Sequence, residues 1–225
     1  MCHTAELPPI RPEFREALFQ ALAVTDGAFA DGTFRIAEIL KRPTDPPMFW
    51  MEGTVSAPLR LVAAMIRESD LSTLAGTLLR WDVLESEAAA PFRRRIFYVS
   101  KLPWPFKNRA FHISSWFEQP TSNSFGILST SIPSNGDMHA AAGTSVWGDV
   151  AFSGYHLVSL GPRLCWLRRV IGIELRLPMP RRLLCRSLVQ VYRGNYKWMS
   201  KAACSDLVLR FEQRIANDPF YSSLP

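Results

Sequence analysis

The stretch Lys101–Phe111, KLPWPFKNRAF, places two large aromatic residues, Trp104 and Phe106, beside two prolines and follows them with three polar or basic residues. Proline fixes the backbone φ angle and removes a hydrogen-bond donor, so the segment is predicted to be an extended loop. Large apolar side chains on a loop raise the question of what they contact. The residues on either side of the loop indicate which elements surround it.

Short segments rich in alternating apolar and polar residues surround this loop from about residue 81 to residue 177. They are divided by clusters of Pro, Gly, Asn and Asp, and such short connections favour antiparallel strand pairing. The expected strands are WDVLESEA (81–88), RRRIFYVSK (93–101), RAFHISSWFEQ (109–119), FGILSTSIP (125–133), SVWGDVAFSGYHLVSLG (145–161) and RLCWLRRVIGIELRL (163–177).

Helices and two further strands are expected outside this region. RPEFREALFQALAV (11–24) has an apolar helical face after Pro12, and PTDPP separates two alternating segments, TFRIAEILKR (33–42) and MFWMEGTV (48–55). Two short helices are expected at Pro58–Arg67 and at about Leu71–Trp81. A long helix is expected at about Pro180–Ala216, with Gly194 as a weak point and with Leu184, Leu188, Val191, Met199, Ala203, Leu207 and Phe211 at helical spacing.

This order of elements predicts an α+β fold, a curved antiparallel sheet whose concave face is covered by the long C-terminal helix. A strongly curved sheet closed by one helix tends to leave a cavity, which is a candidate ligand site. We expect one domain over residues 11–225, preceded by a tail at residues 1–10. The composition, with 48% apolar and 20% charged residues, is that of a folded protein.

The net charge of +6 is concentrated near the C-terminus. From Arg163 to Lys201 there are ten Lys or Arg and one acid, Glu174, a local net charge of +9. On the expected helix, Arg182, Arg186, Arg193, Lys197 and Lys201 lie on one side. Such a face suits an anionic lipid surface or nucleic acid, and a plain solvated face is the alternative.

The expected location is the cytosol. The N-terminal MCHTAELPPI has neither a basic nor an apolar signal region, and no apolar run is long enough to span a membrane. The four cysteines, Cys2, Cys165, Cys185 and Cys204, have no CxxC spacing, which fits a reducing compartment. Any membrane contact is therefore expected to be peripheral and transient.

Three stretches together resemble the steroidogenic acute regulatory protein-related lipid-transfer (START) domain. FWMEGTVSAPLRLVAAMIRESDL (49–71) is similar to the family's glycine-containing strand and Pro-started helix. KLPWPFKNRAF is similar to its PWPL-x-x-RDF motif, and the third feature is the C-terminal helix. The resemblance covers about residues 10–216 and implies the helix-grip fold, with a hydrophobic tunnel that holds one lipid and is gated by the 101–110 loop and the terminal helix.

The resemblance implies a set of site residues. The expected lining comes partly from the strand at 109–119, because its alternation places Phe111, Ile113, Ser115 and Phe117 on one face. Each aromatic residue has a plain core position as its alternative. The full expected lining is Phe97, Trp104, Phe111, Ile113, Ser115, Phe117, Trp147, Tyr155, Trp166 and Met199. The expected gate and membrane contacts are Trp104, Phe106, Lys107, Arg109, Arg182, Arg186, Arg193 and Lys197, and Arg109 has a structural role as its alternative.

Two departures from the family pattern bear on the ligand. Ala110 stands where the motif has Asp, and the positions of the acid and Arg pair of some sterol-binding members fall near Ile96 and Ser115, which weakens a sterol assignment. The lipid is left open among phospholipid, sphingolipid and sterol-like molecules. Arg168 would meet a phosphate if it pointed inward, although an outward, solvated position is favoured.

An enzyme is not expected. The four histidines show no metal-ligand spacing, and GTSVW around Ser145 departs from the G-x-S-x-G elbow at Trp147. No cofactor and no metal are expected, and the chain is expected to be a monomer. The alternative function is a non-enzymatic sensor or interaction domain of the same fold that binds a small apolar ligand or none. Nucleic-acid binding ranks third, because no recognised motif supports it.

Overall fold

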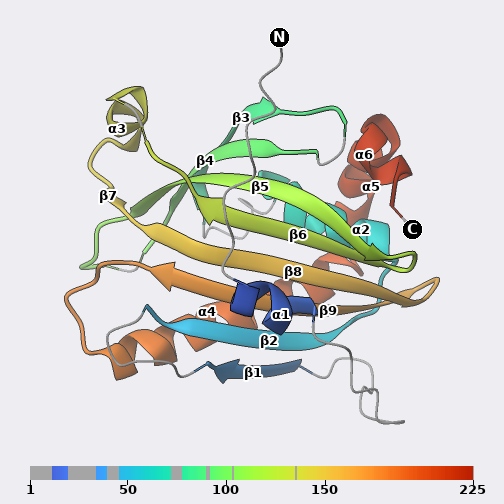
Figure 1. Ribbon diagram of the computed structural model, residues 1–225, viewed down its shortest axis with the longest axis horizontal. Coiled ribbons are helices and arrows are strands. Elements are labelled where there is room, and N and C mark those ends of the chain that lie inside the picture. The colour runs from blue at the N-terminus through green and yellow to red at the C-terminus, as the bar shows by residue number, and fades with distance from the viewer. Residues whose placement is uncertain are drawn as a thin grey trace.

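The computed structural model describes residues 12–19, 34–39, 46–71, 78–89, 92–102, 104–134 and 136–224. Its centre is a curved nine-stranded sheet (Figure 1). Along the strand order β1-β2-β9-β8-β6-β5-β4-β3 every neighbouring pair is antiparallel, whereas the short β7 pairs with β5 in parallel. The strands are β1 (Phe34–Glu38), β2 (Met48–Val55), β3 (Leu78–Ser86), β4 (Arg94–Ser100), β5 (Arg109–Thr121), β6 (Ser124–Ser131), β7 (Val146–Trp147), β8 (Asp149–Gly161) and β9 (Leu164–Glu174).

Helices cover both faces of this sheet. The helix α1 lies across the face nearer the viewer in Figure 1, over β8 and β9, and α4 runs behind the sheet. The helices α2, α5 and α6 gather at one end, where α2 packs against α5. The helices are α1 (Pro12–Phe19), α2 (Leu59–Arg67), α3 (Gly136–Ala142), α4 (Arg181–Ala202), α5 (Leu207–Asn217) and α6 (Pro219–Ser222).

The α+β helix-grip architecture expected from the sequence is confirmed, but three local predictions are wrong. Leu78–Trp81, expected to end a short helix, begins β3, because Leu78 and Trp81 pair with Ser100 and Tyr98 of β4 and that pairing overrides local helix propensity. The rest of that expected helix, at 72–77, lies outside the described residues, as do 20–24 of the first helix. The sequence also predicts no helix at 136–142, where α3 lies.

The third difference concerns the C-terminal helix. It passes through Gly194 without a break and ends at Ala202, before α5 begins at Leu207. Ser205 accounts for the interruption, because its hydroxyl donates to the Ala202 carbonyl at 3.0 Å and accepts from the Leu207 amide at 3.4 Å. A side chain that bonds to the backbone in this way favours a helix end and a new helix start.

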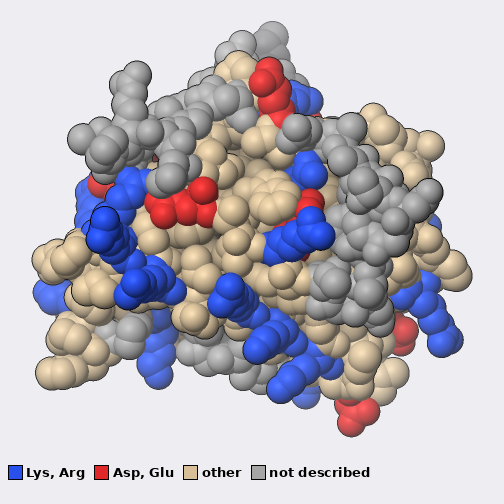
Figure 2. Space-filling model, turned by 90° about the horizontal axis from the view of Figure 1, so that it is seen from below, with Lys and Arg blue, Asp and Glu red and all other residues tan. Residues whose placement is uncertain are grey.

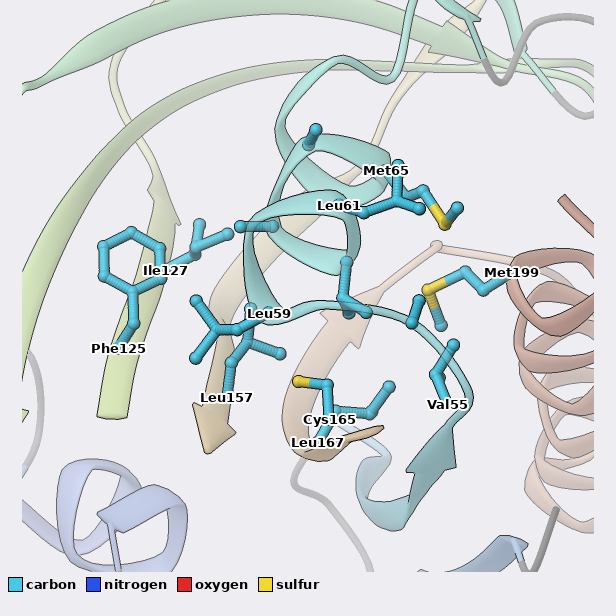
Figure 3. Close-up of a cluster of buried hydrophobic side chains, with 14 of the residues drawn as sticks. Val55, Leu59, Leu61, Met65, Phe125, Ile127, Leu157, Cys165, Leu167 and Met199 are labelled. Atoms are coloured by element: carbon cyan, nitrogen blue, oxygen red, sulfur yellow. The ribbon is translucent and has the colours of Figure 1, made fainter. Parts of the chain in front are cut away.

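The main hydrophobic core lies where α2 meets the sheet and the terminal helix (Figure 3). The sequence starts α2 after Pro58, and Leu61, Val62 and Met65 are buried at helical spacing. In Figure 3, Leu59 lies toward Leu157 of β8, and Met65 lies toward Met199 of α4. This core joins α2 to α4 and closes one end of the space beneath the sheet.

The outer face of the sheet is buried beneath α1. Phe14 and Leu18 of α1 pack on Phe152 and Val170, and the Phe14 ring stacks on Phe152 at 5.3 Å between centroids. Because β8 and β9 are covered on both faces, their sequences are apolar at successive positions rather than strictly alternating. The sequence pattern therefore does not show which residues of β8 and β9 face inward.

Candidate functional site

A cavity of about 360 Å³ lies between the concave face of the sheet, α2 and α4. Its walls are mainly aliphatic and aromatic, and a few polar groups interrupt them. A largely apolar cavity of this size lies at the lower end of the range of pockets that hold small molecules. The apolar lining includes Met51, Met65, Ile96, Phe111, Ile113, Phe117, Ile127, Leu167, Ile171, Leu188, Tyr192 and Met199.

Six of the ten residues expected to line a ligand site lie in this wall. Four of them come from β5, where the period of two turns every second side chain inward. Ser115 is already paired there, because it accepts a hydrogen bond from Ser129 at 3.1 Å. The six are Phe111, Ile113, Ser115, Phe117, Tyr155 and Met199.

Three other expected lining residues lie elsewhere. Phe97 is fully buried on the outer face, where it packs with Ala110 and Ala142. Trp147 packs against Phe97, with ring centroids 6.1 Å apart. Trp166 is fully buried beside His156, also away from the cavity. Phe97 and Trp166 therefore occupy core positions, their stated alternative, whereas Trp147 is half-buried.

The 101–110 loop starts at the cavity and then leaves it. Lys101 and Leu102 contribute to the cavity wall, and the backbone of Leu102 is held by Asn108. Trp104 is 92% exposed, so its indole does not plug the cavity. Phe106 is half-buried and Lys107 is exposed.

Arg109 is buried, which corrects its expected contact with a membrane. Its guanidinium donates to the backbone carbonyls of Leu175, Arg176 and Lys107. The motif arginine therefore ties the loop to the residues between β9 and α4, the structural role given above as its alternative.

The four basic residues expected on the helix are all exposed on α4: Arg182, Arg186, Arg193 and Lys197. Three of them border a surface groove of about 840 Å³, together with Glu38 and Phe49. Figure 2, seen from below, shows Lys and Arg side chains spread widely over this side of the molecule and fewer acidic side chains among the described residues. The basic residues of α4 thus form an exposed face.

At the α2 end, the cavity wall contains a closed network of charges. Arg67 and Arg94 both line the cavity, and Glu68 accepts hydrogen bonds from them at 3.0 and 3.3 Å. Asp218 also binds both arginines, and the Tyr221 hydroxyl donates to Glu68 at 2.8 Å. Two cations and two anions balance here, as buried charges require.

Two adjacent arginines of β9 lie on opposite faces. Arg168 points outward but is buried, 3.3 Å from Glu52 and with its guanidinium carbon 5.0 Å from the centre of the Trp166 ring. Arg169 points into the cavity. Arg168 was considered as a phosphate contact, whereas Arg169 was not among the expected site residues. Alternation places Arg169 on the same face as Leu167 and Ile171, but the sequence does not show that this face is the inward one, because both faces of β9 are apolar.

The described residues give no support to a metal site, because they contain no group of three or more His, Cys, Asp or Glu able to hold an ion. Within the same residues, no helix is long and apolar enough to cross a bilayer.

The chain matches no family model, and no curated protein matches it in sequence. Solved structures do resemble it. Human STARD10 superposes with a TM-score of 0.74 at 14% identity, over 100% of this chain and 93% of that one. Human StAR-related lipid transfer protein 5 gives 0.65 at 12% identity, over 85% and 93%. A STAR-related lipid transfer protein from Xanthomonas axonopodis gives 0.61 at 12% identity, over 79% and 97%. These likenesses confirm the START-type fold that the sequence motifs predict.

Proposed function

We propose that this chain holds one lipid in the internal cavity and transfers it between membranes. The observation that carries the proposal is the mainly apolar cavity between the sheet and α4. A cavity of this kind shields lipid from water, where each exposed methylene costs about 0.8 kcal/mol. The fold supports the same proposal, since two of the similar structures are named lipid transfer proteins.

The surface has features that suit a peripheral and transient contact with a membrane. Trp104 presents an almost fully exposed indole, a side chain that favours the bilayer interface. The basic residues of α4 would face anionic lipid head groups, which attract Lys and Arg near the surface. We infer that the loop and α4 touch a cytosolic membrane surface together.

The cavity approaches the surface on the side of this loop. Lys101 and Val191 both line the cavity and are also exposed, so the cavity lies close to the surface there. We infer that the loop and α4 separate at this point to release the lipid. Lipid that passes directly from the cavity to a bilayer stays in apolar surroundings, so its transfer is nearly neutral in free energy.

The loop is tested by a double substitution, Trp104→Ala with Phe106→Ala, in an assay of fluorescent lipid transfer between vesicles. If the loop aromatics contact the membrane, transfer slows by about tenfold, which corresponds to ~1.4 kcal/mol. The melting temperature should change little, because Trp104 makes few contacts within the protein. The matched control is Leu209→Ala, which removes another exposed apolar side chain on α5. Unchanged transfer with a large fall in melting temperature would identify the loop aromatics as core residues.

A sensor domain with a small apolar ligand is the second candidate function. The modest cavity volume of about 360 Å³ favours it over the transfer of a bulky two-chain lipid. The same assay separates the two functions, since a sensor would load a ligand without moving it between vesicles.

A further inference from the structure

Arg169 lines the cavity as a cation to which no described residue supplies a counterion. It extends from the middle of β9, opposite Met51 of β2 and Tyr155 of β8. Within the described part of the chain its guanidinium has no ion pair or hydrogen bond, and its buried Nε has no hydrogen-bond partner. Arg169 is half-buried, and a charge that is partly removed from water favours a partner of opposite charge.

Three arginines that are more deeply buried than Arg169 show the contrast. Arg67 and Arg94 share Glu68 and Asp218, and Arg168 on the outer face lies beside Glu52. Each of these three side chains therefore has a carboxylate partner in the folded protein. No described acid is given to Arg169, although it lies on the same strand as Arg168.

Three tyrosines of the cavity wall surround Arg169. Its guanidinium carbon lies 4.7 Å from the centre of the Tyr155 ring and 5.2 Å from that of Tyr192, and its charge also acts on Tyr98. Burial raises the pKa of all three phenols, which Arg169 opposes only in part. The tyrosines therefore stay neutral at physiological pH and do not cancel the positive charge.

Neutral phenols beside a cation are hydrogen-bond donors available to an anion. The Tyr192 hydroxyl is buried and has no hydrogen-bond partner among the described residues. A guanidinium and a phenol bind the oxygens of a carboxylate or phosphate well, because charge-assisted hydrogen bonds to such oxygens are strong. The arrangement lies within the apolar cavity, apart from the basic face of α4.

We propose that Arg169, with Tyr98, Tyr155 and Tyr192, forms an internal anion site that binds the acidic head of a single-chain amphiphile. The head is a carboxylate or a phosphate, and the apolar chain lies along the cavity. The cavity volume of about 360 Å³ suits one chain better than two. This inference rests on the proposed function and names the chemical class of its ligand.

The test compares three ligands that share one chain and differ in the head group: oleate, monooleoyl lysophosphatidate and oleyl alcohol. Each is titrated into the delipidated full-length protein, with displacement of a fluorescent fatty acid as the readout. We expect at least one of the two acids to bind about tenfold more tightly than the alcohol, a difference of ~1.4 kcal/mol. Tighter binding of oleate would identify the preferred head group as a carboxylate, and tighter binding of the lysophosphatidate would identify it as a phosphate.

Arg169→Met should remove the preference, since it keeps an unbranched side chain but no charge. Its affinity for the alcohol should stay close to that of the native protein. Arg210→Met, at an exposed position of α5, is the matched control that should keep the preference. If Arg169→Met does not fold, the comparison of acid and alcohol in the native protein decides alone. Equal binding of acids and alcohol overturns the anion site and leaves lipid binding intact. Binding of none of the three in the presence of measurable binding of other lipids also overturns it, whereas failure to bind any lipid contradicts the proposed function itself.

Discussion

At the scale of single residues, His156 shows how the outer face of the sheet responds to pH. Its ring lies between Phe19 and Trp166, with centroids 5.1 and 5.7 Å away. Burial and, to a smaller extent, the nearby charge of Arg168 together lower its pKa to about 4. The folded protein therefore keeps His156 neutral at pH values where the unfolded chain protonates it.

This shift predicts a loss of stability in mild acid. Between the unfolded pKa of about 6.5 and the folded value near 4, the unfolded state binds more protons, so stability falls as the pH falls through this window. The contribution of His156 is roughly 3 kcal/mol across it. Melting temperatures of the native protein and His156→Gln, measured from pH 7 to pH 4.5, should converge as the pH falls. Parallel curves for the two proteins would show that His156 does not titrate in this way.

Residue-level predictions from the sequence succeed where one face of a strand is easy to recognise. The alternation of β5 placed Phe111, Ile113 and Ser115 together, and they do share the cavity wall. On β9 both faces are buried, so alternation could not distinguish Arg168 from Arg169. The direction of Trp104 was also open, because a proline-bounded loop is oriented by distant contacts such as those of Arg109.

At the scale of elements, the docking of α1 depends on two glycines of the sheet. A Cβ atom on Gly154 would lie 2.6 Å from both Leu18 and Phe152, and one on Gly126 would lie 2.7 Å from Phe19. Distances this short force a neighbour to move. The glycines of β6 and β8 therefore provide the space into which α1 packs.

Gly154→Ala should destabilise the protein by about 1–3 kcal/mol, the usual cost of overpacking a close-packed site. The control is Gly172→Ala on β9, where the nearest atom to a new Cβ is 3.8 Å away. Thermal unfolding of both variants measures the difference. A fall in melting temperature that is as large for Gly172→Ala as for Gly154→Ala would refute this account of α1 docking.

The order of the elements was largely predictable, and their exact ends were less so. Strand and turn residues located most of the sheet, and Pro58 located the start of α2. The break after Ala202 was missed, because apolar residues continue at helical spacing through Leu207 and Phe211 on both sides of it. Only the side-chain bonds of Ser205 reveal it.

At the scale of the whole molecule, the charges in the interior differ in arrangement from those on the surface. The interior holds a balanced network at the α2 end, and Arg169 in the cavity wall has no counterion among the described residues. The exterior carries the basic face of α4 and the exposed Trp104. The basic stretch was visible in the sequence, but the cavity was only implied, since its walls come from strands far apart in the chain.

The central claim, that the cavity holds one lipid, is tested most directly by native mass spectrometry of the full chain purified without detergent. The account predicts a species heavier than the bare chain by the mass of one lipid. That species should return to the mass of the bare chain after solvent extraction, and the extracted molecule should be identifiable as a lipid. A spectrum of bare chain alone, unchanged after incubation with lipid vesicles of mixed composition, would contradict the claim.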